Sequence, residues 1–447
     1  MSIRKNIHNF KLALIHSHLI GRGGSQRYVL EIAHTLKKLG CDLDIYTFEY
    51  NKEKCYPELA QDLNIYSVTT ISEKVAASKN NLILLEKIKL RIKTSFIYKL
   101  YVLLGIDYLR ESRISDKEAQ MLAKLILDNQ QTKNIKYNLI FAHEEPVSIW
   151  SAIKVKQIQN IPIYWFCYET IEKWFLDWKD TGKHLSKIRS IVLTKLLFLK
   201  DKRRIRKYVD QIAVLDTNIR KKVESTYKIT PLIRRGGINA ELLQKTTKSS
   251  YLKNLYPPAA NKTIILTVSR FVAYRRIHDI LEMFQRFNNE QKSKVFIYIN
   301  APITDHNYYH KCMSDYNDLL THPNIIIDTE YPASDTVLHN IYNSADIFIF
   351  PNEKQTWGHA PIEAIAGNAV AVISDGSGIS EIFKDIAPTI YKKGNIEELT
   401  SIVSSLIENK SKRQNYLAKQ KAYIKDNLTW KIICKEYLRD FKKLIYH

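Results

Sequence analysis

The hydrophobic positions of the chain form short apolar runs separated by longer segments with helical spacing. The first half has such runs at Leu12–His16, Leu43–Phe48, Leu139–Ala142, Ile163–Cys167 and Gln211–Leu215. The second half has them at Ile264–Val268, Val295–Ile299, Ile325–Asp328, Ile347–Phe350 and Ala369–Ile373. Strands of buried parallel sheets read as short apolar runs, and the helices between them are amphipathic. The pattern therefore predicts an α/β protein with two Rossmann-like, doubly wound domains.

Composition is consistent with two domains that each have a sizeable core. The chain has 447 residues, of which 45% are hydrophobic and 26% are charged, as in soluble globular proteins. The five cysteines are scattered and form no CxxC pair, which indicates reduced thiols. The N-terminus lacks the features of a signal peptide, and no uncharged run approaches the roughly 18 residues of a membrane span. We expect a soluble, cytoplasmic protein.

The net charge of +22 is concentrated in particular segments. Residues 183–207 contain ten Lys or Arg and a single acid, Asp201, and a second basic, apolar segment covers 81–110. Basic amphipathic segments suit an anionic membrane surface, so we predict peripheral contact with the inner face of the cell membrane. A uniformly basic surface is the alternative. Nucleic acid is not an expected partner, because no motif for binding it accompanies the charge.

The first candidate site lies between Ser344 and Phe383, where strand, loop, helix and strand follow one another. A helix N-terminus leaves amides without partners and favours an anion such as phosphate. Glu363, about one turn inside the helix, is placed to accept hydrogen bonds from ligand hydroxyls. The loop and helix start that would bind the anion consist of Trp357, Gly358, His359 and Ala360.

Two further candidates follow strands of the first half. Gly23 and Gly24 stand between the first strand and a helix that stops at Gly40, where glycine allows a ligand to approach the backbone closely. An ordinary tight turn is the alternative. No GxGxxG or P-loop pattern is present, which disfavours NAD and ATP. His143 ends an apolar strand, a position where ligand-facing residues gather, although a lone histidine is also compatible with a structural role.

The segment after Ser344 resembles the donor-binding region of retaining glycosyltransferases of family four, which have the GT-B fold. The matching residues are Pro351-Asn352, Gln355-Thr356-Trp357-Gly358, Ile362-Glu363-Ala364-Ile365-Ala366-Gly367 and Gly378-Ile379-Ser380-Glu381-Ile382. Ser269-Arg270 and Arg275-Arg276 resemble another motif of that family, and Arg235-Gly236-Gly237 resembles the turn that closes its first domain. The resemblance implies two Rossmann-like domains facing across a cleft. These are an N-terminal domain at 1–240, a donor domain at 241–427 and a final helix at 428–447 that packs back on the first domain.

The resemblance also implies roles for individual residues. Arg270 and Arg275 would grip the donor diphosphate, with Arg275 in place of the family's lysine, and Glu363 would bind the ribose. Gln355 stands where the family has a glutamate that contacts the donor hexose. Gly23 and Gly24 would lie near the donor phosphates, and His143 would reach the transferred sugar. Four of these residues are therefore candidates for catalysis, namely Arg270, Arg275, His143 and Gln355.

The implied activity is that of a hexosyltransferase-type glycosyltransferase that retains anomeric configuration. It would move a sugar from a UDP- or GDP-sugar to a hydroxyl of a glycan or polyprenyl-linked acceptor, in surface polysaccharide biosynthesis. Fixed arginines would stabilise the leaving group, so no metal or other cofactor is expected. Two alternatives stay open. One is a nucleotide-sugar epimerase with the GT-B fold. The other is a catalytically weakened nucleotide-sugar binder associated with the membrane, because Gln355 lacks the charge of glutamate.

Overall fold

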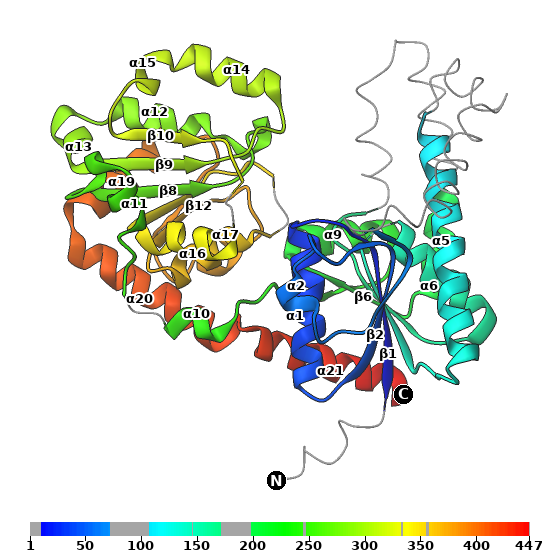
Figure 1. The fold of residues 1–447 in the computed structure, drawn as a ribbon. Helices are drawn as coiled ribbons and strands as arrows, with labels where there is room; N and C mark the ends of the chain where they lie inside the picture. The colour runs from blue at the N-terminus through cyan, green and yellow to red at the C-terminus, as the bar shows by residue number, and fades with distance from the viewer. Residues whose placement is uncertain are drawn as a thin grey trace, which may run out of the picture. The chain divides into compact units, whose positions relative to one another are not determined.

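The structure is a computed structural model that describes residues 10–71, 107–144, 146–170, 198–244, 247–331, 334–354 and 357–446. Packing divides the chain into two compact units (Figure 1). Unit 1 is Met1–Arg234 with Cys434–His447, and unit 2 is Arg235–Ile433. The division falls before the junction expected near residue 240. The glycines that follow Arg235 pack within unit 2, where a Cβ on Gly236 would lie 2.5 Å from Trp357 Nε1.

Unit 1 contains a seven-stranded sheet in the order β3-β2-β1-β4-β5-β6-β7. Each neighbouring pair is parallel. The strands are β1 (Lys11–Leu19), β2 (Asp42–Asn51), β3 (Ile65–Ile71), β4 (Leu139–His143), β5 (Ile163–Phe166), β6 (Gln211–Val214) and β7 (Leu232–Ile233). The central strands β4 and β5 are buried along their whole length, as parallel strands covered on both faces must be.

Helices cover both faces of this sheet. They are α1 (Gly24–Lys38), α2 (Pro57–Ala60), α5 (Asp107–Thr132), α6 (Val147–Gln159), α9 (Thr217–Tyr227) and α21 (Trp430–Tyr446), whose part from Cys434 belongs to unit 1. Residues 198–208 are also helical. One face of the sheet packs against α5 and α6. Helices α1 and α21 contact each other, since Tyr28 Oη lies 3.3 Å from Tyr437 Oη. The chain therefore closes its first sheet with a segment from its far end.

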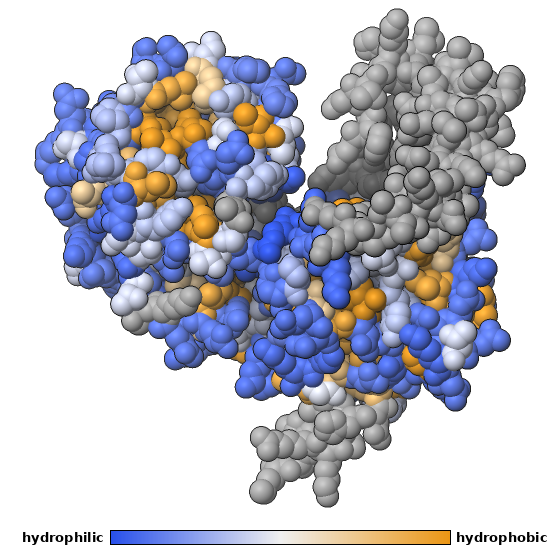
Figure 2. Space-filling model, viewed as in Figure 1, coloured by the Kyte–Doolittle hydropathy of each residue, from blue (hydrophilic) through white to orange (hydrophobic). Residues whose placement is uncertain are grey.

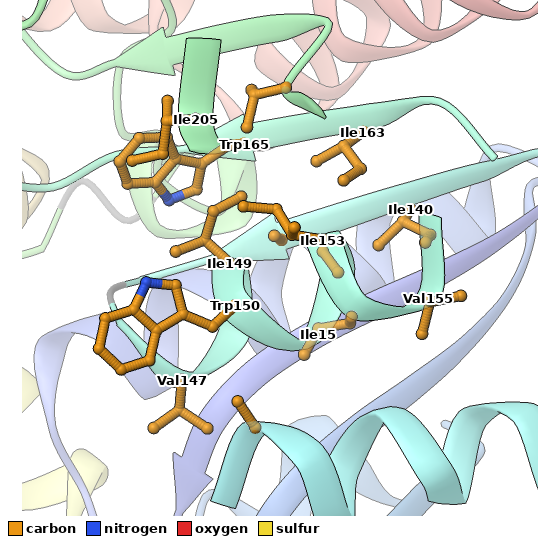
Figure 3. Close-up of a cluster of buried hydrophobic side chains, with 14 of the residues drawn as sticks. Ile15, Ile140, Val147, Ile149, Trp150, Ile153, Val155, Ile163, Trp165 and Ile205 are labelled. Atoms are coloured by element: carbon orange, nitrogen blue, oxygen red, sulfur yellow. The ribbon is translucent and has the colours of Figure 1, made fainter. Parts of the chain in front are cut away.

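Apolar side chains from the strands and α6 form the core of unit 1. Ile15, Ile140 and Ile163, from three neighbouring strands, lie beside Ile149 and Ile153 of α6 (Figure 3). Trp165 belongs to the same cluster and is fully buried. This tryptophan is therefore part of the core of unit 1.

Unit 2 contains a six-stranded parallel sheet in the order β10-β9-β8-β11-β12-β13. Its strands are β8 (Thr263–Val268), β9 (Val295–Asn300), β10 (Ile325–Asp328), β11 (Ile347–Phe350), β12 (Val370–Ser374) and β13 (Ile390–Tyr391). Its longer helices are α12 (His278–Arg286), α14 (His306–Asp315), α16 (Asp335–Ser344), α17 (His359–Ala366), α19 (Ile396–Glu408) and α20 (Lys410–Asn427). The short elements are α10 (Ala240–Gln244), α11 (Tyr251–Leu255), η3 (Pro257–Ala259), η4 (Ala273–Arg275), α13 (Asn289–Lys294), α15 (Asn317–Leu320) and α18 (Ser380–Phe383).

In both sheets the order of the strands reverses beside the first strand, after three strands have been laid down. Unit 1 builds outward from β1 to β2 and β3, then returns to β4 on the other side; unit 2 does the same around β8 and β11. Ligands of doubly wound sheets bind outside the carboxyl ends of the strands at such a reversal. The topology alone therefore predicts one ligand-binding position in each unit.

All ten strands expected from the apolar runs are present, and the doubly wound α/β fold is confirmed. The structure adds β3, β7 and β13, which all lie at sheet edges. In the view of Figure 2 the described surface is mainly hydrophilic, with small apolar patches. Within the described ranges, no helix is both long enough and apolar enough to cross a bilayer.

Candidate functional site

Two arginines meet at the reversal point of unit 2. Arg270 follows β8, and its Nη2 lies 3.4 Å from Tyr274 Oη. The guanidinium carbon of Arg275 lies 5.1 Å from the centre of the Tyr274 ring. Burial lowers the pKa of Arg275, and the nearby charge of Arg270 lowers it further. Tyr274 thus holds two like charges close together, an arrangement that an anionic ligand would stabilise.

The neighbouring Arg276 holds this turn in place. Its φ of 50° is left-handed, and its Nε donates to Asp279 Oδ2 at 2.9 Å. Asp279 is fully buried, and its hydrogen bond with Arg276 raises the pKa of the guanidinium. The same guanidinium lies 3.9 Å from Glu353 Oε2. Arg276 therefore links the buried Asp279 to the loop that carries Glu353.

The loop after β11 is tied to the same turn. Glu353 N donates to Tyr274 O at 2.8 Å. Behind the loop, Ser374 Oγ of β12 donates to Asn352 O at 2.9 Å. A Cβ on Gly376 would lie 2.4 Å from Glu353 O, so only glycine fits there without a shift. The carboxyl ends of β8, β11 and β12 therefore converge on one loop cluster.

Helix α17 starts from this cluster. Its N-cap, Gly358, has a φ of 141°, and a Cβ there would lie 2.7 Å from the ring of Phe350. Trp357 is buried beneath Arg235, whose guanidinium carbon lies 5.5 Å from the ring centre and whose Nη1 donates to Glu381 Oε1 at 2.6 Å. His359 and Ala360 form the first turn, and Glu363 is partly exposed one turn further along.

The structure thus places the predicted donor-binding residues of unit 2 at one edge of one sheet. Arg270 and Arg275 follow β8, while Trp357, Gly358, His359, Ala360 and Glu363 follow the adjacent strand, β11. Gln355 lies outside the described residues. The helix start supplies amides and the turn supplies guanidinium groups, which together suit a diphosphate.

Three predicted residues lie at the reversal point of unit 1. Gly23 is the N-cap of α1, and Gly24 is its first residue. His143 ends β4 in register with His16 of β1. The buried His143 ring stacks on Phe166 with centroids 4.8 Å apart, and Tyr168 Oη lies 3.4 Å from its Nδ1. Burial, followed by the nearby His16, holds the pKa of His143 well below the ordinary value, so the imidazole is neutral at pH 7.

Sequence reasoning missed Glu144, the residue after His143. Its φ is 75°, and its Oε2 lies 3.5 Å from His16 Nε2. A charged residue directly after an apolar strand was the only signal in the sequence. Its neighbour in space, His16, is more than a hundred residues away along the chain, so the local pattern did not reveal the contact.

Comparison with known proteins identifies relatives of the chain. Residues 253–423 match the family described as Glycosyl transferases group 1. An uncharacterized glycosyltransferase of Methanocaldococcus jannaschii is 24% identical over 278 residues, 60% of this chain and 67% of that protein. The capsular polysaccharide biosynthesis glycosyltransferase CapM of Staphylococcus aureus is 23% identical over 202 residues, 45% of this chain and about half, 51%, of CapM.

Among solved structures, the Anabaena protein Alr3699/HepE in complex with UDP and glucose has a similar fold. The TM-score is 0.65 at 11% sequence identity, covering 97% of this chain and 100% of that one. Structures this distant in sequence bear on the fold alone. The family match within unit 2, the related glycosyltransferases and the two doubly wound sheets lead to one assignment: residues 253–423 form a group 1 glycosyltransferase domain, and the chain has the GT-B fold of a glycosyltransferase.

Proposed function

We propose that the protein transfers a sugar, with retention of anomeric configuration, from a nucleotide-diphosphate donor to a hydroxyl acceptor. The observation that carries this proposal is the pair of guanidinium groups that both lie against Tyr274, after the strand adjacent to the one that precedes α17. Arg270, Arg275 and the first amides of α17 would bind the diphosphate, and Glu363 would bind the ribose hydroxyls.

These groups would act on the leaving group. Negative charge grows on the diphosphate as the glycosidic bond breaks, and each well-placed donor lowers the barrier by about 3–4 kcal/mol. The acceptor hydroxyl would attack from the face that the diphosphate leaves, and its proton would pass to a departing phosphate oxygen. A neutral His143 would hydrogen-bond to the transferred sugar. The proposed mechanism assigns charge stabilisation to arginines and amides, and it includes no metal or organic cofactor.

Relatives guide the choice of substrates. HepE has been solved with UDP and glucose, which supports a UDP-sugar as the first donor to test, with GDP-sugars as the alternative. CapM is named for capsular polysaccharide biosynthesis. We therefore propose a glycan acceptor, lipid-linked or destined for the cell surface, and a cytoplasmic enzyme working at the inner face of the membrane.

The described part of one basic segment supports contact with that membrane. In helix 198–208, Lys200, Arg203 and Lys207 are exposed, and Leu199 is 46% exposed beside them. Each cation near an anionic surface contributes about 1 kcal/mol. The rest of this segment and most of the other basic segment, 81–110, lie outside the described residues.

Co-sedimentation with vesicles tests the membrane contact. We expect binding to phosphatidylglycerol vesicles at low salt, loss of binding in 1 M salt and weaker binding by a Lys200→Glu/Arg203→Glu/Lys207→Glu variant. Binding that ignores lipid charge and salt would contradict this part of the proposal.

Donor binding and product analysis test the activity. A thermal-shift screen of UDP-, GDP- and ADP-sugars should reveal one donor that raises the melting temperature by mass action. Incubation of that donor with lipid extract should then place the sugar on lipid or glycan. An epimerised donor as the product would favour a nucleotide-sugar epimerase. Donor binding without turnover would favour a protein that only binds nucleotide sugars. Arg270→Ala, which changes an exposed side chain, should abolish turnover without unfolding the chain.

A further inference from the structure

Glu144 is held in a backbone conformation that glutamate rarely adopts. Its φ of 75° lies in the left-handed region, and three contacts fix it there. Glu144 N donates to Phe166 O at 3.3 Å. Glu144 O accepts from Trp165 Nε1 at 3.3 Å and from Ser148 Oγ. Such strain persists only where surrounding structure enforces it, and it clusters at functional sites.

The side chain of Glu144 stands between two polar groups of unit 1. One carboxylate oxygen lies 3.5 Å from His16 Nε2, and the other lies 3.5 Å from Ser25 Oγ of α1. His16 is fully buried, and its Nε2 makes no hydrogen bond among the described residues. The Glu144 side chain itself remains 30% exposed. The carboxylate therefore lies against both His16 and Ser25, and part of it is exposed to solvent at the carboxyl edge of the sheet.

Further acids lie nearby along the same edge. His18, two residues beyond His16 on β1, lies 3.5 Å from Glu49 Oε2 and 3.8 Å from Glu118 Oε2. Three carboxylates therefore surround the ends of β1, β2 and β4, in a chain whose net charge is +22. A phosphate would be repelled here, whereas hydroxyl groups would find acceptors.

We propose that Glu144 binds the acceptor by accepting a hydrogen bond from a hydroxyl next to the one that reacts. This inference rests on the proposed function, in which the proton of the reacting hydroxyl passes to phosphate, so the carboxylate serves a different hydroxyl. The acceptor end is then a sugar of a glycan and not a bare lipid phosphate. His16 and Ser25 are positioning residues that orient the carboxylate.

Transfer from the donor selected by the thermal-shift screen is measured with octyl β-D-glucopyranoside, octyl β-D-galactopyranoside and farnesyl phosphate as acceptors. We expect the wild type to use an octyl glycoside and not farnesyl phosphate. Glu144→Ala should raise the KM for the glycoside on the order of tenfold to a hundredfold, the effect of losing a hydrogen bond to a charged group. The KM for the donor should stay unchanged. Glu224→Ala, at an exposed carboxylate of the same unit, is the matched control and should behave as wild type.

The positioning role is tested separately. His16→Gln keeps an N–H donor and should raise the acceptor KM less than His16→Phe, with the donor KM unchanged in both variants. Transfer to farnesyl phosphate alone, transfer to none of the three acceptors, or an unchanged acceptor KM in Glu144→Ala would each overturn the inference. Failure of the proposed function has a different signature, namely donor binding that is indifferent to Arg270→Ala.

Discussion

The two units have the same kind of sheet, yet their reversal points carry opposite chemistry. In unit 2 the strand ends present Arg270 and Arg275 beside a helix N-terminus. In unit 1 the equivalent place presents a neutral His143 and the carboxylate of Glu144. Topology sets where a doubly wound sheet binds ligands, while side chains set what it binds. On our proposals, unit 2 takes the diphosphate and unit 1 takes the hydroxyl-bearing acceptor.

The units also differ in how the chain builds them. Unit 2 is one continuous segment, whereas unit 1 needs the residues from Cys434 onward. Arg234 holds this returning segment through two hydrogen bonds of 2.7 Å to Asp440, and Tyr164 Oη donates to the same carboxylate at 2.8 Å. The side chains of Arg234 and Asp440 are 17% and 11% exposed.

The largest effect is expected from breaking this pair. Asp440→Ala leaves a largely buried guanidinium without its carboxylate, and removing one partner of a buried ion pair costs about 3–5 kcal/mol. Urea unfolding, monitored by the fluorescence of the tryptophans of unit 1, should show this loss of stability. Donor binding by unit 2 should stay unchanged. Glu436→Ala, at a partly exposed carboxylate 4.0 Å from Arg234, is the control and should cost no more than about 1 kcal/mol. Equal effects of the two variants would contradict this account.

The next effect concerns the cations of unit 2. Arg275→Ala should lower kcat about 10²- to 10³-fold, because a donor aimed at the developing charge is lost. Arg275→Lys should fall between wild type and alanine, since lysine keeps the charge without the planar fork. Arg286→Ala, at an exposed arginine of α12 that pairs with Glu282, is the matched control. Steady-state kinetics with the selected donor would decide; equal losses at Arg275 and Arg286 would remove the basis for the diphosphate site.

Most of the fold could be predicted from the sequence, because buried parallel strands are continuous apolar runs such as Ile347–Phe350. The strands that escaped prediction are exceptions to that pattern. β3 reads IYSVTTI and mixes polar with apolar residues at a sheet edge, and β7 and β13 have only two residues each. These edge strands pair on one side only, which requires little apolar sequence.

The candidate site was only partly visible in the sequence. The motifs around Arg270 and Glu363 are local, so the residues were found. The contacts of Arg276 with Glu353 and of Glu144 with His16 join distant parts of the chain. Only the fold brings these partners together, so their roles could not be read from local patterns.

A smaller effect concerns the histidines of unit 1. Burial lowers the pKa of both His143 and His16 below the ordinary value of 6.5. The unfolded chain then binds more protons than the folded one below pH 6.5, so this contribution to stability is complete above that pH and is lost as the pH falls. The slope is at most about 1.4 kcal/mol per pH unit for each histidine. His18, whose pKa is raised beside Glu49, contributes in the opposite sense and loses stability as the pH rises.

Melting curves between pH 7.5 and pH 5 test this assignment. The His143→Gln variant should lose less stability than the wild type when the pH is lowered, because one buried neutral imidazole has been removed. Parallel pH dependences for the two proteins would show that His143 is not the group responsible.

The smallest effect on stability concerns Gly24 and Gly358, both of which the sequence predicts as donor-binding residues. A Cβ on Gly24 would meet no protein atom within 4 Å, whereas one on Gly358 would lie 2.7 Å from the Phe350 ring at a φ of 141°. Gly24→Ala should therefore leave the melting temperature unchanged or raise it, since alanine in a helix gains about 0.5–1 kcal/mol over glycine. Gly358→Ala should destabilise unit 2. If a ligand approaches the backbone at Gly24, the alanine variant will be fully folded yet slower in transfer. Unchanged transfer by that variant would mean that the space beside Gly24 is not occupied during the reaction, and the predicted role of this glycine would be lost.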